Sequence, residues 1–506
     1  MEVFVRKKNN PSGVISIQII DKSTGKYHVV KTVGSSSDAL EINALYQEGK
    51  RWIQSHAKQS SLDFSQEDAL VQQFVDAIQS VRLAGIDLLL GKIFNDIGFN
   101  KIKDEIFRHL VFYRLLDPVS KLKTTEYLYR YQQIYWDEDK IYRYMDKLHS
   151  KQKELVQQIS YEHTVKVLGS EPQMVFYDVT TVYFEIEQED DLRQTGFSKE
   201  GRHQNPQIVL GLLVSKNGYP LAYDVFDGKK FEGHTLLPMI EAFKTKYCLE
   251  SLVVIADAGL LSKSNMELLL AKKYEFIIGA RIKNEIHQLQ KQILEHTYQN
   301  GSTSIFSKEN GMKLIVSYAD KRAKKDAINR ERGLRKLEKQ VRQHKLSKSS
   351  INNKGYNKYL KLTGDITVEI DYEKYHQDAR WDGLKGYYTN SKLSAQEIID
   401  NYNQLWQIEK AFRVAKTDLK IRPVYHRLSK RIEAHICLTF VAYKVYKELE
   451  RVLKEKKATI SATKAIEIAS FIFSITTKLP ASMETITIPL IKTEEQKLLA
   501  SLFDWK

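Results

Sequence analysis

The sequence predicts an α/β protein, because strand-like and helical segments alternate in its middle third. Five short segments rich in Val, Ile, Leu and aromatic residues are expected to be strands, at 174–185, 208–215, 220–226, 252–257 and 274–280. Apolar residues at helical spacing mark two helices, at about 235–247 and 262–272. The run at 252–257 is almost wholly apolar, as in a central strand covered on both faces. The order of three strands, helix, strand, helix, strand matches an RNase H-like core, a mixed sheet flanked by helices.

Length and charge narrow the class of protein. At 506 residues the chain is too long for a single hydrophobic core, so several domains are expected. Its 78 Lys and Arg residues exceed its 63 Asp and Glu residues, and the net charge of +15 favours a polyanionic partner. A basic protein that is merely soluble is the alternative interpretation of the charge alone.

Cysteine usage and hydropathy indicate a cytoplasmic protein. Cys248 and Cys437 lie far apart in the chain, fit no zinc-ligand spacing and suggest no disulfide framework. The sequence shows no apolar signal region at its start and no run of about 18 apolar residues that would span a membrane. We therefore expect a cytoplasmic, nucleoid-associated protein that has no membrane partner.

The first 170 residues are expected to form a module of their own. Residues 14–34 predict a β-hairpin with a glycine in its turn. From Asp38 to about Val167 the apolar spacing is helical, with one break at the Leu116–Pro118 corner. We predict that this 1–170 module, a hairpin followed by helices, contributes to binding of a nucleic acid.

The predicted core is interrupted by a basic segment. The first part of the core, 171–281, is followed by a predicted insertion domain at 282–393. Its run at 321–348 holds twelve Lys and Arg against three Asp and Glu, with apolar residues at helical spacing. Strands are expected at 365–372 and 383–390. The basic helix either faces DNA or is a solvated surface; the residues predicted to contact DNA are Arg332, Arg335, Lys339 and Arg342.

A long amphipathic helix is expected to return the chain to the core. The sequence Ser-Ala-Gln-Glu at 394–397 is a capping box, and helical spacing continues to about Leu419. This helix and the segment after it make up a predicted core region at 394–445. Helical patterns fill most of the remaining C-terminal region, 446–506.

Two aspartates close apolar runs in predicted core strands. Asp178 follows the apolar run at 174–177, and Asp257 ends the run at 252–257. Strand ends of α/β sheets are where ligand-binding and catalytic groups gather. The alternative for each is an ordinary aspartate that caps the following turn.

A glutamate on the long helix is the third acidic candidate. At 100° per residue, Glu409 lies on a polar strip with Tyr402, Arg413 and Lys416. That strip borders a predicted buried stripe formed by Ile408, Phe412, Ala415 and Leu419. The alternative for Glu409 is an exposed pair with Arg413, worth tenths of a kcal/mol.

Three carboxylates suffice for phosphodiester chemistry with two metal ions. One ion makes the nucleophile and the other stabilises the leaving oxygen. Magnesium prefers carboxylate oxygens, phosphate and water, so no His or Cys ligand is required. Asp178, Asp257 and Glu409 are therefore predicted as metal ligands for two Mg²⁺ ions, with Mn²⁺ as a substitute.

The stretch Tyr-Asn-Gln-Leu-Trp-Gln-Ile-Glu-Lys-Ala-Phe-Arg-Val-Ala-Lys at 402–416 resembles a known signature. Bacterial insertion-sequence DDE transposases carry Tyr-x2-Arg-x3-Glu-x6-Lys around their last catalytic acid. Tyr402, Glu409 and Lys416 fall on this pattern, whereas Leu405 stands at the arginine position. The sequences at 196–213, 223–235, 253–262 and 422–426 are also similar to a branch of that group. The resemblance covers roughly 170–445.

The resemblance implies a function and assigns roles. It implies that Asp178, Asp257 and Glu409 are the catalytic triad, that Tyr402 and Lys416 hold the DNA end, and that an insertion domain precedes the glutamate helix. Arg413 is a candidate to replace the missing arginine. Trp406 could stack on a flipped base, with core packing as its alternative.

We expect from the resemblance a DNA transposase that binds terminal inverted repeats, cleaves the ends and joins the 3′-hydroxyl to target DNA. Double-stranded DNA would be its partner, and a homodimer would form on paired ends. The alternatives are an RNase H-like nuclease without strand transfer and a catalytically inactive DNA-binding relative. Neither the repeat sequence, nor the target site, nor the cleavage route follows from the sequence.

Overall fold

The computed structural model describes residues 3–56, 64–198, 201–260, 263–308, 311–343, 345–352, 354–363, 367–479 and 482–505. The chain divides into two compact units. The first comprises 1–80 with 476–487, and the second comprises 81–475 with 488–506. Within the described parts, no helix is long and apolar enough to cross a membrane.

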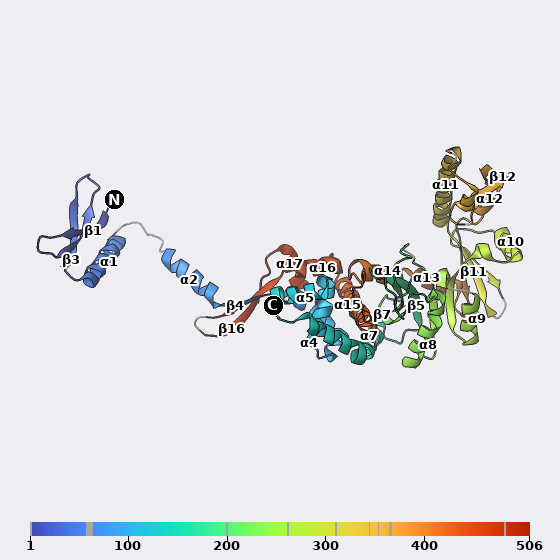
Figure 1. Ribbon diagram of the computed structural model, residues 1–506, viewed down its shortest axis with the longest axis horizontal. Coiled ribbons are helices and arrows are strands. Elements are labelled where there is room, and N and C mark those ends of the chain that lie inside the picture. Colours follow the sequence, from blue (N-terminus) through green and yellow to red (C-terminus); the bar gives the residue numbers. More distant parts are fainter. Residues whose placement is uncertain are drawn as a thin grey trace. The chain divides into compact units, whose positions relative to one another are not determined.

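The first unit contains a three-stranded antiparallel sheet and α1 (Ala39–His56), which packs against it (Figure 1). The strands are β1 (Val3–Asn9), β2 (Ile15–Asp21) and β3 (His28–Ser36), in the order β1-β2-β3. Ile17, Ile19 and Ile20 of β2 are fully buried. The hairpin predicted at 14–34 is confirmed as β2 and β3. The first strand, β1, has the cation-rich sequence VFVRKKN and was not predicted. After α1 the chain continues into α2 (Phe64–Ala77).

The second unit is organised around a mixed eight-stranded sheet, in the order β10-β11-β14-β9-β8-β5-β6-β7. The five predicted core strands are β5 (Met174–Tyr183), β6 (Gln207–Ser215), β7 (Pro220–Asp227), β8 (Val253–Ala256) and β9 (Glu275–Ala280). β5 pairs antiparallel with β6 and parallel with β8, and β8 pairs parallel with β9. The two predicted helices are α8 (Leu236–Lys246) and α9 (Lys263–Ala271). The predicted order and the mixed α/β fold are therefore confirmed.

Part of the predicted insertion at 282–393 continues the core sheet beyond β9. Its strands β10 (Thr303–Ser307), β11 (Lys313–Tyr318) and β14 (Leu384–Thr389) pair in antiparallel register with one another and with β9. They follow α10 (His287–Glu295). The predicted boundary of an insertion domain stays a prediction, and the structure adds that these three strands belong to the main sheet.

The chain segment between β11 and β14 forms a small hydrophobic core of its own. It is made by α11 (Asp320–Arg342), β12 (Leu360–Thr363), β13 (Thr367–Ile370) and α12 (Tyr372–Ala379), which Figure 1 shows together. Leu337 of α11 packs there with Tyr359, Leu360 and Val368. The basic helix predicted over 321–348 is thus confirmed in its main part, with its apolar face turned to β12 and β13.

Helices from both ends of the second unit pack around α15 (Ser429–Glu455). Its helical partners are α3 (Gly85–Ile97), α4 (Glu105–Leu116), α6 (Glu138–Lys147), α7 (Lys153–Leu168), α14 (Trp406–Thr417) and α16 (Ala462–Ala469). The break predicted at Leu116–Pro118 is confirmed as the end of α4. From α3 onward, the helical part of the predicted 1–170 module, including α5 (Lys121–Gln132), therefore lies in the same unit as the main sheet, whereas α1 and α2 belong to the first unit.

The C-terminal region contains strands as well as helices. β15 (Phe473–Lys478) and β16 (Thr485–Pro489) form a three-stranded sheet with β4 (Ile78–Leu83), and α17 (Glu494–Phe503) follows. Neither β4 nor this strand pair was expected, because all three are short and lie beside stronger helical signals.

The long helix predicted over 394–419 is two helices, α13 (Ala395–Asn403) and α14. The backbone tightens between them: Leu405 N donates to Tyr402 O at 3.0 Å and Ile408 N donates to Leu405 O at 3.2 Å. The capping box of Ser394 and Glu397 is present. Of the predicted stripe, Ile408, Phe412 and Leu419 are buried and Ala415 is half-buried. The prediction of a single continuous helix was wrong. The predicted apolar face of α14 is confirmed, since α14 packs against β5 and β6.

Candidate functional site

Asp178 and Asp257 lie side by side on adjacent strands. Tyr177 of β5 is in parallel register with Ala256 of β8, so the next residue along each strand is one of the two aspartates. Both line one cleft of about 460 Å³. One carboxylate oxygen of each accepts a hydrogen bond from the following backbone amide, at 2.8 Å for Asp178 and 2.7 Å for Asp257. The sheet therefore brings together the two predicted acids from its centre.

The same cleft is lined by residues that the sequence did not single out. Phe197 and Phe231 are exposed aromatic side chains, and Lys229 and Lys230 precede Phe231. They belong to the two stretches, 196–213 and 223–235, that carry part of the family resemblance. Aromatic residues close to lysines in the sequence could have indicated these cleft residues, because aromatic rings stack on bases and lysines bind phosphates.

Glu409 belongs to α14, which packs against β5. Its side chain is exposed and is not among those that line the cleft of the two aspartates. Two neighbours connect it to Asp257. Tyr402 Oη donates to Asp257 Oδ1 at 3.4 Å, and Lys385 Nζ lies 4.5 Å from the centre of the Tyr402 ring.

The electrostatics of these neighbours show that Asp257 and Glu409 act on the same groups. Burial and the nearby Arg322 lower the pKa of Lys385, whereas Asp257 and Glu409 act to raise it. Burial raises the pKa of Tyr402 far above its usual value, and Asp257 and Glu409 add to that shift. Lys385 and Tyr402 therefore lie within the electrostatic range of both carboxylates.

Lys385 was not predicted as a site residue. It stands in β14, in the strand expected at 383–390, two residues before Tyr387. Its position beside Glu409 depends on the pairing of β14 with β9, which no local pattern reveals.

The other predicted residues of the 402–416 stretch differ in how far their side chains are exposed. Tyr402 is 6% exposed and Leu405, at the signature's arginine position, is buried. Arg413 is exposed and Lys416 is half-buried. Trp406 is 47% exposed, so core packing, the alternative considered for it, is wrong. Together with Lys410, Trp406 lines a separate cleft of about 630 Å³.

The predicted DNA-contacting residues of α11 share one surface. All four are exposed, while Leu337 between them is buried. One of them, Arg335, forms an ion pair with Glu331 one turn earlier. The basic face of α11 is therefore opposite its packed face; these residues are Arg332, Arg335, Lys339 and Arg342.

The donor set suits magnesium by type, since it consists of carboxylates. The positions of the three carboxylates fit a shared metal site only in part. Throughout the described part of the chain, no group of three or more His, Cys, Asp or Glu side chains is arranged to hold a metal ion. Asp178 and Asp257 already meet at one cleft, and Glu409 lies nearby on α14.

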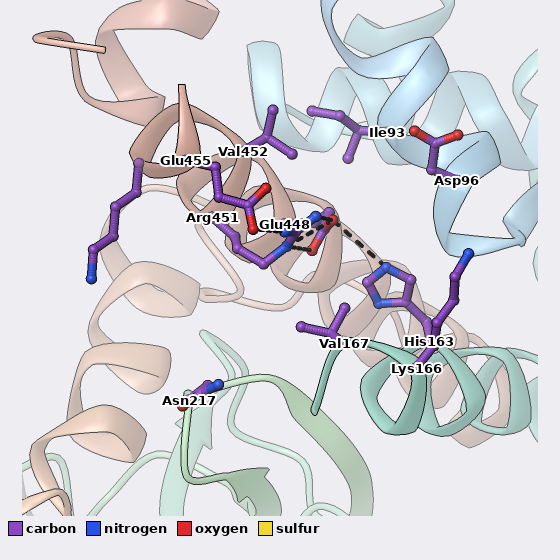
Figure 2. Close-up of a pocket in the computed structure, with 11 residues that line it drawn as sticks. Ile93, Asp96, His163, Lys166, Val167, Asn217, Glu448, Arg451, Val452 and Glu455 are labelled. Atoms are coloured by element: carbon purple, nitrogen blue, oxygen red, sulfur yellow. Dashed lines mark hydrogen bonds and ion pairs between the residues drawn. The ribbon is translucent and has the colours of Figure 1, made fainter. Parts of the chain in front are cut away.

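Another cleft, of about 780 Å³, lies elsewhere and contains none of the predicted site residues. Figure 2 shows Glu448 and Arg451 of α15 in its wall, with His163 of α7 facing Glu448. Glu448 accepts from Tyr219 Oη at 2.5 Å and from Arg451 Nη2 at 2.6 Å. Burial raises the pKa of Glu448, but hydrogen bonds from His163, Arg451 and Tyr219 outweigh it and lower the value to about 2. This network joins α7 and α15 to the residue before β7.

A comparison with family profiles agrees with this geometry. A family profile described as "Transposase DDE domain" matches residues 169–444, more than half of the chain. A search of curated proteins found no match. Among solved structures, a piggyBac transposase synaptic complex with hairpin DNA, determined by cryo-EM, is similar at 8% identity and a TM-score of 0.38, over 79% of each chain.

Proposed function

Because the chain belongs to the transposase family defined by the DDE domain, we propose that it is an insertion-sequence transposase. It would bind the terminal inverted repeats of the element, cleave the ends and join the 3′-hydroxyl to target DNA. The observation that carries this proposal is the meeting of Asp178 and Asp257 at one cleft, with Glu409 and Asp257 acting on the same two neighbours.

Asp178, Asp257 and Glu409 would hold two Mg²⁺ ions, with Mn²⁺ as a substitute. When bound, such ions supply a nucleophile at neutral pH and stabilise the leaving oxygen. The protein's own groups prepare the site. Tyr402 holds the carboxylate of Asp257 by its hydroxyl, and the ammonium of Lys385 counters the charge of Asp257 and Glu409.

The surroundings of the carboxylates suit a DNA substrate. Phe197 and Phe231 offer exposed rings beside Lys229 and Lys230, and the net charge of the chain is +15. Trp406, which lines a separate cleft with Lys410, is an exposed aromatic residue on the glutamate helix. Arg413, Lys416 and the basic face of α11 would add phosphate contacts. The 1–170 region would recognise the repeats, and a homodimer would form on paired ends.

A strand-transfer assay tests the proposal. Linear DNA carrying both element ends is incubated with the protein, Mg²⁺ and a supercoiled target plasmid, and the products are mapped by sequencing. The DNA that flanks the gene is first searched for imperfect inverted repeats, which would supply the ends. We expect cleavage at the ends and covalent joining of the 3′ ends to the plasmid. Cleavage without joined products would support a nuclease instead, and DNA binding with neither product would support an inactive relative.

A further inference from the structure

Four basic side chains gather at the far end of the glutamate helix. Arg114 of α4 donates from Nη1 to the carbonyl oxygen of Leu419 at 3.4 Å and from Nη2 to His435 Nδ1 at 3.2 Å. The other ring nitrogen of His435, Nε2, lies 3.1 Å from the carbonyl oxygen of Ile421. The His426 ring lies 5.4 Å from that of His435. Lys121, the first residue of α5, is close enough to Arg114 and both histidines to affect their charge.

All of these groups except His426 are buried. Arg114 is 5% exposed, Lys121 is 7% exposed and His435 is 5% exposed. Within the described residues, no carboxylate pairs with any of the four, and the ammonium of Lys121 has no hydrogen-bond partner. A buried cation without an anionic partner is costly, so proteins ordinarily pair it or leave it in water. This cluster of Arg114, Lys121, His426 and His435 lacks an anion.

Protonation follows from the same burial. Burial and Arg114 hold the pKa of Lys121 well below its usual value, and burial lowers the pKa of Arg114 to about 10. Burial, Lys121 and Arg114 together lower the pKa of His426 to about 3, so that imidazole is neutral near pH 7. His435 is also neutral and accepts from Arg114 at Nδ1, so its Nε2–H donates to Ile421 O.

The exposed residues next to the cluster in the sequence suit a nucleic acid. Tyr425 and Leu428 are exposed in the segment before α15, and Leu122 is exposed next to Lys121. Lys430 and Arg431 follow in the first turn of α15, where both pair with Asp146. An exposed aromatic ring among cations is the usual composition of a surface that tracks a DNA backbone.

The position of the cluster connects it to the candidate active site. Leu419, which accepts from Arg114, follows Glu409 by ten residues, most of them in α14. A helical rise of 1.5 Å per residue puts the two about 15 Å apart along the helix. That distance corresponds to two or three nucleotides of an extended strand, so one DNA segment can reach both places.

We propose that Lys121, backed by Arg114, His426 and His435, binds a phosphodiester group of the DNA on which this transposase acts. The inference rests on the proposed function and adds a specific phosphate contact outside the family's signature stretch. The phosphate supplies the anion that the cluster lacks, and Lys121 is its direct ligand.

The test compares Lys121→Met with Lys123→Met, a matched control on the same helix whose ammonium is exposed and pairs with Glu126 at 2.6 Å. Fluorescence anisotropy with duplex DNA measures affinity at several salt concentrations. Lys121→Met is expected to reduce the slope of log affinity against log salt by about 0.9, the value of one phosphate contact. Lys123→Met is expected to leave the slope unchanged.

A second measurement uses inorganic phosphate and does not depend on DNA. At constant ionic strength, phosphate should raise the melting temperature of the wild-type protein above its value in chloride, and Lys121→Met should abolish this difference. In chloride, Lys121→Met should melt at or above the wild-type temperature, because the unpaired ammonium is lost.

The outcomes separate the two proposals. A wild-type slope and a wild-type phosphate response in Lys121→Met would overturn the phosphate site, and so would a marked loss of folding in that variant. If the wild-type protein binds no DNA, the proposed function fails, and the phosphate response alone then decides whether the cluster is an anion site.

Discussion

Tyr402 Oη donates a hydrogen bond to Asp257 Oδ1 at 3.4 Å, which joins α13 to the end of β8. The tyrosine is 6% exposed, so its hydroxyl is directed to the carboxylate from within the protein. The resemblance implies a DNA contact for this residue, and that prediction is not tested by the structure. The hydrogen bond indicates that Tyr402 positions the carboxylate of Asp257, and this role can be tested separately from a DNA contact.

Tyr402→Phe removes the hydroxyl and leaves the ring in place. Losing one hydrogen bond to a charged group at this length should cost about 1 kcal/mol, a roughly fivefold slower cleavage rate at saturating DNA. The DNA dissociation constant should change less than twofold. Single-turnover cleavage and anisotropy measure the two quantities. Weaker DNA binding with a normal cleavage rate would instead support a direct DNA contact.

Gly279 leaves room for the Tyr402 hydroxyl. A Cβ at this position in β9 would lie 2.5 Å from Tyr402 Oη, whereas a Cβ at Gly259 would meet only Asp257 Oδ2 at 3.8 Å. Gly279→Ala should therefore displace the tyrosine, lower stability by about 1–3 kcal/mol and slow cleavage. Gly259→Ala is the control and should be near normal. Equal melting temperatures and cleavage rates for both variants would show that Tyr402 is not held tightly against Gly279.

The predictable part of the fold is the part with strong local patterns. The five core strands and two helices were found because β5, β6 and β8 are apolar over their length and are separated by turns. The break between α13 and α14 was missed because Leu405 is a good helix former, and its burial in the core is a tertiary effect. The pairing of β14 with β9 is equally non-local, so the segment at 282–393 looked separate from the sheet.

The candidate site divides in the same way. Asp178 and Asp257 were found because each directly follows an apolar run, although Asp178 lies within β5 and not at its end. Glu409 was found through its spacing from Tyr402 and Lys416. Lys385 could not be found, since only the folded sheet places it over the Tyr402 ring. The sequence left base stacking and core packing both open for Trp406, because an aromatic residue at helical spacing looks the same in sequence whether it packs or faces solvent; in the structure it is exposed.

Glu448 should make stability depend on pH. Its pKa is lowered to about 2 in the folded protein from a usual value of 4.5. The stabilisation is therefore complete above pH 4.5 and is lost as the pH falls toward 2. Glu448→Gln should reduce the free energy of unfolding at pH 7 by about 3 kcal/mol, and this difference should shrink below pH 4.

Urea denaturation of both proteins across this pH range measures the difference. Glu455→Gln on the same helix is the control, because Glu455 is exposed although it also pairs with Arg451. It should change the free energy of unfolding by less than about 1 kcal/mol at any pH. A difference between wild type and Glu448→Gln that does not vary with pH would contradict the assigned network.

The basic face of α11 can be tested by charge removal. Changing Arg332, Arg335, Lys339 and Arg342 together to Gln should weaken DNA binding and flatten its salt dependence, by up to about 0.9 per lost phosphate contact. Stability should be nearly unchanged, because these side chains are exposed. Anisotropy against salt concentration gives the slope. A wild-type slope would indicate that this face of α11 is a solvated surface and does not contact DNA.

The most direct test of the proposed active site is end cleavage by Glu409→Gln in Mg²⁺. The substitution keeps the size of the side chain and removes the charge that would hold a metal ion. Folding and DNA binding should survive, since Glu409 is exposed on α14. Cleavage should fall by several orders of magnitude, as it should for Asp178→Asn and Asp257→Asn, and double variants should be hardly worse because the three act as one unit. A Glu409→Gln protein that cuts transposon ends at a near wild-type rate would contradict the triad.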